Sequence, residues 1–206
     1  MRLCALKDNK RGRQLRKPTY KLAFMTAVCL SAIFMTACQT PTTTMGKKDP
    51  EKAVKVRTQL AAEYIKSGEL DSAKRALDQA LDIDSRDSAA NMMMGILLQQ
   101  EGSKTSMDKA EAYFKRAISA DPQNAQARNN YGTYLYQVER YNDAIEQLNV
   151  AGTTLGYDQR YKALENVGRI YLKLGDVANA EKSFKQALQV NRDSSISMLE
   201  LSEIFY

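Results

Sequence analysis

Small and large apolar residues recur at a helical spacing along most of the chain. Two alanines stand seven residues apart with a larger apolar residue between them, and this arrangement occurs four times. The alanine pairs are Ala73/Ala80, Ala110/Ala117, Ala144/Ala151 and Ala180/Ala187, and the residues between them are Leu77, Phe114, Leu148 and Phe184. Residues four and seven apart share one face of a helix. The pattern therefore predicts four amphipathic helices, each packed against another helix.

A second pattern precedes each alanine pair and predicts the other helix of each unit. An apolar residue is followed by a small residue and then, three positions further on, by Tyr or Leu. It reads Leu60-Ala61…Tyr64, Met94-Gly95…Leu98, Tyr131-Gly132…Leu135 and Val167-Gly168…Tyr171. Three units have glycine where the chain must turn between the helices, namely Gly68, Gly102 and Gly175, whereas the third has Glu139. Glycine adopts the left-handed conformation of such turns at little cost.

The two patterns together predict an array of helix pairs over residues 51–206. The repeats run at about 54–87, 88–124, 125–160 and 161–194, and the second contains an enlarged turn over residues 102–106. Residues 195–206 match the first helix of a fifth repeat, with Leu201, Ser202 and Phe205 in register. Because terminal repeats usually end in a polar cap, this apolar end indicates a truncated sequence. A short isoform and an array completed by a partner are the alternatives.

The N-terminal residues 1–37 have the pattern of a secretory signal peptide. Eight Lys and Arg residues precede an uncharged stretch of 16 residues, Leu22–Ala37. A helix of that length spans roughly 24 Å, less than the ~30 Å of a hydrocarbon core. A basic leader, a short apolar run and small residues at its end are typical of a cleaved signal.

The apolar run ends in Met35-Thr36-Ala37-Cys38, which resembles a bacterial lipobox. This resemblance implies that Cys38 becomes the lipidated N-terminus, and Gln39 in place of Asp implies sorting to the outer membrane. The alternative is an ordinary thiol within a membrane anchor. Residues 38–50 are rich in Thr, Pro, Gly and Lys, so we expect a flexible tether that holds the folded domain off the bilayer.

Charge and composition exclude several classes of function. The net charge of +6 arises in the leader, because residues 38–206 contain 22 basic and 23 acidic residues. The folded part therefore lacks the basic surface of a nucleic-acid-binding protein. The chain has no histidine and no Cys-x-x-Cys pair, and Asp78, Asp82, Asp84 and Asp87 lack the spacing of a calcium loop. We expect no enzymatic activity, cofactor, metal or small-molecule substrate.

The period and the residue pattern resemble the tetratricopeptide repeat. The third and fourth repeats also resemble one family in particular, the type IV pilus biogenesis/stability lipoproteins of the PilF/PilW family. The similar segments are Ala127–Gly132 (ARNNYG), Arg140-Tyr141, Leu164–Gly168 (LENVG) and Ala180–Phe184 (AEKSF). The lipobox and the start of the array near residue 51 also match that family. One departure is length, because the family has more repeats than this chain.

This resemblance implies a fold and a function. The fold would be an all-α tetratricopeptide-repeat superhelix, a right-handed α-solenoid of antiparallel helix pairs. The function would be that of a pilotin, a lipid-anchored protein on the periplasmic face of the outer membrane that binds the secretin subunit and promotes its localisation and multimer assembly. The alternative is a scaffold for another envelope system, either cell-wall synthesis or outer-membrane protein assembly.

First helices of such repeats line the concave surface, so their exposed positions are the candidate partner-binding residues. By register these are Met92, Met93, Ile96, Asn129, Asn130, Thr133, Glu165, Asn166 and Arg169. Methionine adapts to the shape of a partner, and asparagine both donates and accepts hydrogen bonds. The alternative for the methionines is core packing. For the asparagines it is an exposed polar face or a hydrogen bond within the array.

Lipidation can be tested at the one cysteine that follows two small residues at the end of the apolar run. Replacing the cysteine in Cys38→Ser removes the thiol that would carry the lipid. We expect a precursor that retains its signal and no longer incorporates labelled palmitate. Palmitate labelling that persists in this variant would contradict the lipoprotein interpretation.

Overall fold

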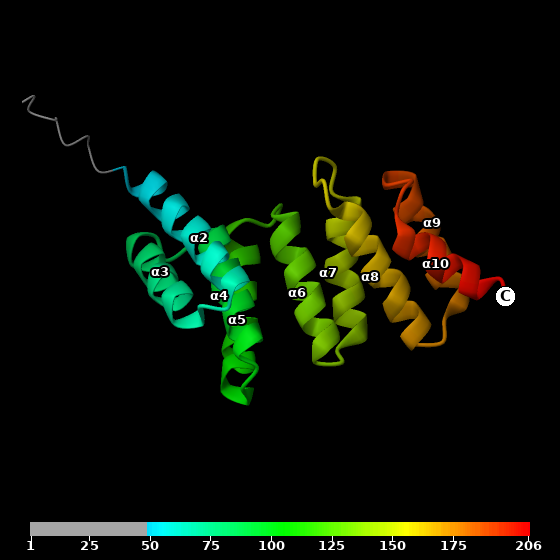
Figure 1. Ribbon diagram of the computed structural model, residues 1–206, viewed down its shortest axis with the longest axis horizontal. Helices are drawn as coiled ribbons and strands as arrows, with labels where there is room; N and C mark the ends of the chain where they lie inside the picture. Colours follow the sequence, from blue (N-terminus) through cyan, green and yellow to red (C-terminus); the bar gives the residue numbers. More distant parts are fainter. Residues whose placement is uncertain (1–48) are drawn as a thin grey trace, which may run out of the picture. The chain divides into compact units, whose positions relative to one another are not determined.

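The computed structural model describes residues 49–206, shown in Figure 1. The predicted signal peptide, the lipidated Cys38 and the predicted tether up to residue 48 lie outside these residues. The described part forms nine α-helices and contains no strand, as the sequence predicted. The helices are α2 (Pro50–Ser67), α3 (Leu70–Ile83), α4 (Ser88–Glu101), α5 (Lys104–Ala120), α6 (Ala125–Gln137), α7 (Tyr141–Thr153), α8 (Arg160–Lys173), α9 (Val177–Val190) and α10 (Ser195–Ile204).

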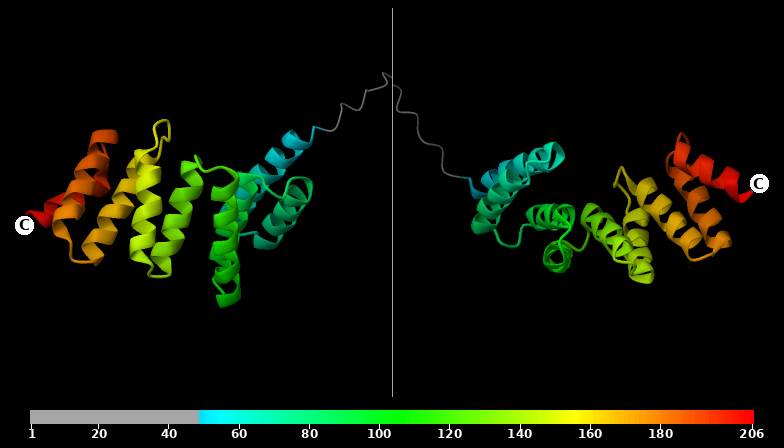
Figure 2. Two further views of the ribbon diagram at one scale, coloured as in Figure 1. Left: turned by 180° about the vertical axis from the view of Figure 1, so that it is seen from behind. Right: turned by 60° about the horizontal axis from the view of Figure 1, so that its bottom comes forward.

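The helices form pairs that follow one another in chain order (Figure 2). Within each repeat the first helix packs along the second, in the pairs α2–α3, α4–α5, α6–α7 and α8–α9. Each second helix also contacts the first helix of the next repeat, and the first helices α2, α4, α6 and α8 contact one another in succession. The first helices therefore share one surface of the array, which we call the first-helix surface.

Local sequence signals explain where the helices begin and end. The Asp49 side chain accepts a hydrogen bond from the Lys52 N–H and Pro50 opens α2, so the last two residues of the predicted tether already form the start of this helix. Gly68, Gly102 and Gly175 adopt positive φ values between the two helices of their repeats. Glu139 occupies the equivalent turn with a φ of 61°. The turn geometry is therefore kept even where the residue has a side chain, at some cost in strain.

The predicted enlarged turn at residues 102–106 is wrong. Gly102 and Ser103 alone separate α4 from α5, and the extra residues lengthen α5 to 17 residues. The cause is capping, because the Ser103 hydroxyl accepts the Ser106 N–H at 3.0 Å and so starts the helix early. The Ser106 hydroxyl in turn donates to Glu101 at 2.8 Å, which ties the longer helix to the end of α4.

The two helices of each repeat approach one another closely at the small residue of the first helix. A Cβ atom added to Gly95 would lie 2.8 Å from the Phe114 ring, and one added to Gly168 would lie 2.7 Å from the Phe184 ring. A Cβ atom added to Gly132 would lie 2.5 Å from the Leu148 side chain. The alanine pairs are fully buried on the facing helices. The predicted role of small residues at helix crossings is thus confirmed for these repeats.

Between the second and third repeats, aromatic rings and an ion-pair cluster link α5 to α6 and α7. The Phe114 ring lies 5.9 Å from the Tyr131 ring and 5.6 Å from the Tyr134 ring. Glu111 accepts hydrogen bonds from the Tyr131 hydroxyl at 3.0 Å and from Arg140 at 2.6 Å, and it pairs with Lys115 at 2.8 Å. Arg140 also donates to Asp143 at 2.8 Å. One carboxylate of α5 therefore contacts α6 and the N-cap residue of α7, Arg140.

The helix-crossing model predicts the effect of enlarging an interior alanine. Ala180 is fully buried in α9, whereas Ala178 on the same helix is exposed. Overpacking usually costs about 1–3 kcal/mol, and Trp is an extreme case. We expect Ala180→Trp to lower the midpoint of thermal unfolding by several degrees, and Ala178→Trp to leave it nearly unchanged. Equal midpoints would show that the register is wrong.

The Glu111 cluster predicts a stability that depends on pH. Partial burial raises the pKa of Glu111, but hydrogen bonds from Lys115, Arg140 and Tyr131 outweigh this and hold the pKa at about 2, below the ordinary value of 4.5. A carboxyl whose pKa is lowered by folding stabilises the fold above its unfolded pKa, and this contribution is lost as the pH falls through the folded value. The unfolding midpoint of the wild type should therefore exceed that of Glu111→Gln above pH 4.5. The difference should shrink toward pH 2, and a difference that stays constant would contradict the assignment.

Candidate functional site

The predicted methionine patch is largely part of the packing between repeats. Met92 is only 3% exposed, and its sulfur accepts a hydrogen bond from Asn130 of the next repeat at 3.5 Å. Met93 and Ile96 are half-buried and pack against the core. Met92 therefore joins α4 to the next repeat, and all three residues offer less open surface in this conformation than their register suggested.

Two polar residues of the third repeat make hydrogen bonds within their own helix. Asn130 donates to the Gln126 carbonyl at 2.9 Å in addition to its contact with Met92. The Thr133 hydroxyl donates to the Asn129 carbonyl at 3.0 Å. Because these donors are already paired, Asn130 and Thr133 have less capacity to bind a partner than their positions suggested.

Glu165 links the fourth repeat to the last helix. Its side chain is 3% exposed and accepts hydrogen bonds from the hydroxyls of Ser194 and Ser197, the second at 3.1 Å. Ser194 is also the N-cap of α10, since its oxygen accepts the Ser197 N–H at 3.1 Å. The buried carboxylate is thus used to fix the start of α10 on α8, where a positive helix end favours a negative charge.

The remaining predicted residues meet in a hollow of about 390 Å³ on the first-helix surface, which we call the first-helix hollow. It is lined by Asn129 of α6, by Asn166 and Arg169 of α8, and by residues in and after the turn between α9 and α10. Glu165 contributes to its wall. The structure therefore brings together four of the nine predicted groove residues, from two adjoining first helices.

The first-helix hollow is polar and carries charges of both signs. Arg169 pairs with Glu200 at 3.3 Å, while Lys162 and Asp193 also line the hollow. The side-chain oxygen of Asn129 is buried and has no hydrogen-bond partner within residues 49–206. Amide and charged side chains of this kind suit the polar groups of a peptide.

A second candidate surface lies on α2 and escaped the sequence analysis. Val56 is 53% exposed and Leu60 is 45% exposed. In the next three repeats the residues at these two helix positions are all buried, namely Ala90, Ala127 and Ala163 at the first and Met94, Tyr131 and Val167 at the second. We call Val56, Leu60 and the neighbouring Glu63 the α2 end face. A comparison of the repeats position by position reveals it, because it shows large apolar residues where no helix of residues 49–206 covers them.

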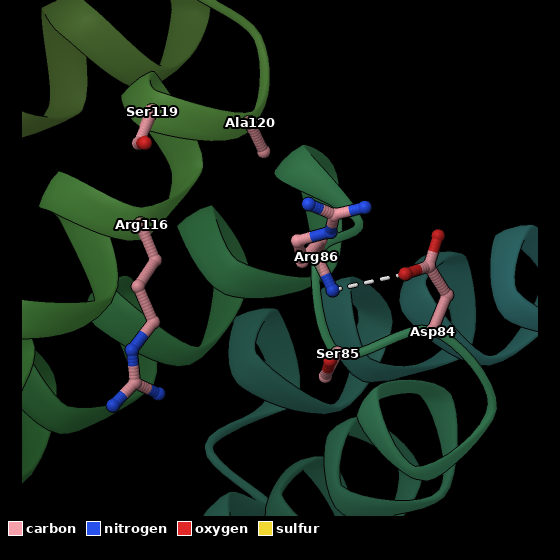
Figure 3. A pocket seen from close by; sticks show the side chains of 6 residues that line it. All are labelled: Asp84, Ser85, Arg86, Arg116, Ser119 and Ala120. Atoms are coloured by element: carbon pink, nitrogen blue, oxygen red, sulfur yellow. Dashed lines mark hydrogen bonds between the residues drawn. The ribbon is translucent and has the colours of Figure 1, made fainter.

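A larger hollow, of about 530 Å³, lies beside the turn between α3 and α4 (Figure 3). Arg86 and Arg116 both line it, but Figure 3 shows their guanidinium groups pointing away from one another. Asp84 accepts the Arg86 N–H at 2.9 Å and adds a negative charge. The residues therefore do not converge on an anion, and this hollow lacks the features of a binding site.

Neither a membrane-spanning helix nor a metal cluster is found in the part of the chain that the structure describes. No helix there combines the length and the apolar character needed to cross a membrane. No group of three or more Cys, Asp and Glu side chains there is placed to hold a metal ion.

The fold and its sequence pattern define a tetratricopeptide-repeat protein. Models of the tetratricopeptide repeat match residues 104–167 in one case, and residues 54–87 and 161–194 in another. The last two ranges contain the pairs α2–α3 and α8–α9. A solved structure of MamA resembles the chain with a TM-score of 0.60 at 17% identity, over 70% of this chain and 82% of that one, which supports the fold alone.

Closer relatives identify the family. The type IV pilus assembly protein PilF of Pseudomonas aeruginosa is 30% identical over 185 residues, which cover 90% of this chain and 71% of that protein. The PilF structure matches with a TM-score of 0.72 at 29% identity, over 76% of this chain and 69% of that one. The structure of PilW, a type IV pilus biogenesis factor, matches with a TM-score of 0.66 at 26% identity. The match covers 73% of this chain and 68% of that one. The chain belongs to this PilF/PilW family of tetratricopeptide-repeat proteins.

Proposed function

We propose that this protein is a pilotin, an outer-membrane lipoprotein that binds the secretin subunit of the type IV pilus machinery and promotes its localisation and multimer assembly. A lipid on Cys38 would anchor it at the periplasmic face, and residues 39–48 would tether the repeat array. Its place in type IV pilus biogenesis follows from the PilF and PilW relatives. The tasks of capture and delivery need a binding surface and no chemistry, so we infer that the protein acts without catalysis.

The observation that carries the proposal is the α2 end face. Large apolar side chains that stay exposed beside each other usually mark a contact with another molecule. Val56 and Leu60 lie four residues apart on one helix and are about half exposed. Because each is already about half buried, burying both in a complex contributes roughly 1 kcal/mol each, and other contacts must supply the rest of the binding free energy.

The first-helix hollow is the second surface in this proposal. Asn129, Asn166 and Arg169 would pair with polar groups of the same secretin subunit, since each would lose water on binding. Leaving one buried polar group without a partner costs about 1–3 kcal/mol. A function in another envelope assembly system would use the same kind of surfaces, but the relation to PilF favours the pilus.

Two variants test the proposed function at the two surfaces. Leu60→Asp places a charge on the α2 end face, and the double variant Asn166→Ala/Arg169→Ala removes polar groups from the first-helix hollow. Each should lower the affinity for the purified secretin subunit by roughly five- to 150-fold, because about 1–3 kcal/mol of contact is lost. Heat-resistant secretin multimer in envelope fractions should fall accordingly.

Leu155→Asp is the matched control for Leu60→Asp. Leu155 is 82% exposed, lies in the turn between α7 and α8, and lines neither surface. The Leu155→Asp variant should bind secretin as the wild type does. All variants should keep the wild-type circular dichroism spectrum. If Leu60→Asp and the double variant both assemble normal amounts of multimer, secretin capture does not use these surfaces.

A further inference from the structure

The first-helix hollow contains two asparagine side chains that no other group of the array uses. Asn129 of α6 and Asn166 of α8 both line it, and neither side chain makes a hydrogen bond within residues 49–206. By contrast, Asn130 on the same helix as Asn129 donates to the Gln126 carbonyl at 2.9 Å. The amides of Asn129 and Asn166 are therefore available, on adjoining first helices, to a group that enters the hollow.

Asn129 has a cost to the fold that a bound partner would remove. Its side-chain oxygen is buried and lacks a hydrogen-bond partner in the described part of the chain, which destabilises the folded array. Thr58 and Asn91 also have such an oxygen, but neither residue lines the hollow, and the Asn91 amide nitrogen makes two hydrogen bonds. Because Asn129 gives up no hydrogen bond when its amide turns, the amide can rotate into the hollow at little cost.

The charges that line the hollow cancel. Lys162 and Arg169 are opposed by Glu165 and Asp193. Arg169 is already paired with Glu200 at 3.3 Å, and Glu165 accepts hydrogen bonds from two serine hydroxyls. Lys162 and Asp193 are exposed, where an ion pair contributes little. A hollow of balanced charge gives neither an acidic nor a basic ligand an advantage, so the uncharged amides are the groups that can recognise a partner.

A pair of free amides matches the backbone of an extended segment. A peptide group presents one N–H donor and one C=O acceptor, and an asparagine side chain offers both kinds of group in return. In a helix these groups are bonded to one another, so a bound helix would leave both asparagines unsatisfied. In an extended chain, residues two apart face the same way at a separation of roughly 7 Å. This approaches the roughly 8–10 Å between packed helix axes, so one segment reaches Asn129 and Asn166 together.

We propose that the first-helix hollow binds an extended segment of the secretin subunit through its backbone, and that Asn129 and Asn166 each pair with one peptide group. This inference rests on the proposed function. The segment has no helix or sheet structure of its own at this point, since its N–H and C=O groups must be free. Recognition of the backbone makes the hollow tolerant of the side chains of the segment and gives binding a weak dependence on salt.

Backbone methylation of a peptide tests this mode of recognition. Short overlapping peptides that cover the secretin subunit are titrated against the purified full-length lipoprotein, and the peptide that binds is then methylated at one backbone nitrogen at a time. The affinity should fall about tenfold at alternate residues, whose N–H groups face the asparagines, and little at the residues between them. Single alanine substitutions in the peptide should have smaller effects. An affinity that depends on one charged side chain and falls steeply with salt overturns the inference.

Two variants test the asparagines themselves. Leucine is similar to asparagine in size and removes both the donor and the acceptor. Asn129→Leu and Asn166→Leu should each weaken peptide binding about tenfold. The unfolding midpoint of Asn129→Leu should equal or exceed that of the wild type, because the replaced oxygen has no partner in the described residues. The control Asn149→Leu, at an exposed position of α7 outside the hollow, should bind as the wild type does. A lower midpoint or unchanged binding for Asn129→Leu overturns its assigned role.

These outcomes separate the extended-segment proposal from the proposed function. If the wild-type protein fails to capture the intact secretin subunit, both proposals fail. If it captures secretin but no peptide binds, or methylation shows no alternation, the pilotin function stands and the extended-segment proposal falls.

Discussion

The close approach of two helices within each repeat is the constraint on which the rest of the array depends. Gly95 and Gly168 leave no room for a Cβ atom against Phe114 and Phe184. This approach buries one large side chain per repeat at close-packed density, and it sets the angle at which the second helix meets the next repeat. Because the same helix crossing recurs in each repeat, successive junctions between repeats have a similar geometry. The exposed positions of the first helices therefore fall on one common surface.

The junctions between repeats use more varied chemistry than the contacts within them. Between the second and third repeats, Glu111 and the Phe114 ring hold Tyr131 and Tyr134. Between α8 and α10, the Glu165 carboxylate binds two serine hydroxyls. Buried polar groups require partners in a fixed geometry, so these contacts specify how neighbouring repeats stack as well as stabilising them.

This use of polar residues changes which side chains remain for a partner. Several first-helix residues that the register predicted to be free are already engaged with a neighbouring repeat, Met92 and Glu165 among them. The surfaces that remain include a polar hollow over α8 and an apolar end face on α2, at separate places on the array. A partner that uses both must be extended enough to reach them, and the two surfaces would recognise different parts of it.

The sequence alone determined the all-helical fold, the helix pairs and the small residues at their crossings, because these depend on periodicity and on turn glycines. It misjudged the turn after Gly102, where the cap formed by Ser103 is a local contact that periodicity does not report. Only the tertiary structure decided that Met92 and Glu165 are covered and that the α2 end face is exposed. Whether a first-helix residue is open depends on which side chain the adjacent repeat places against it, and no pattern within a single helix contains that information.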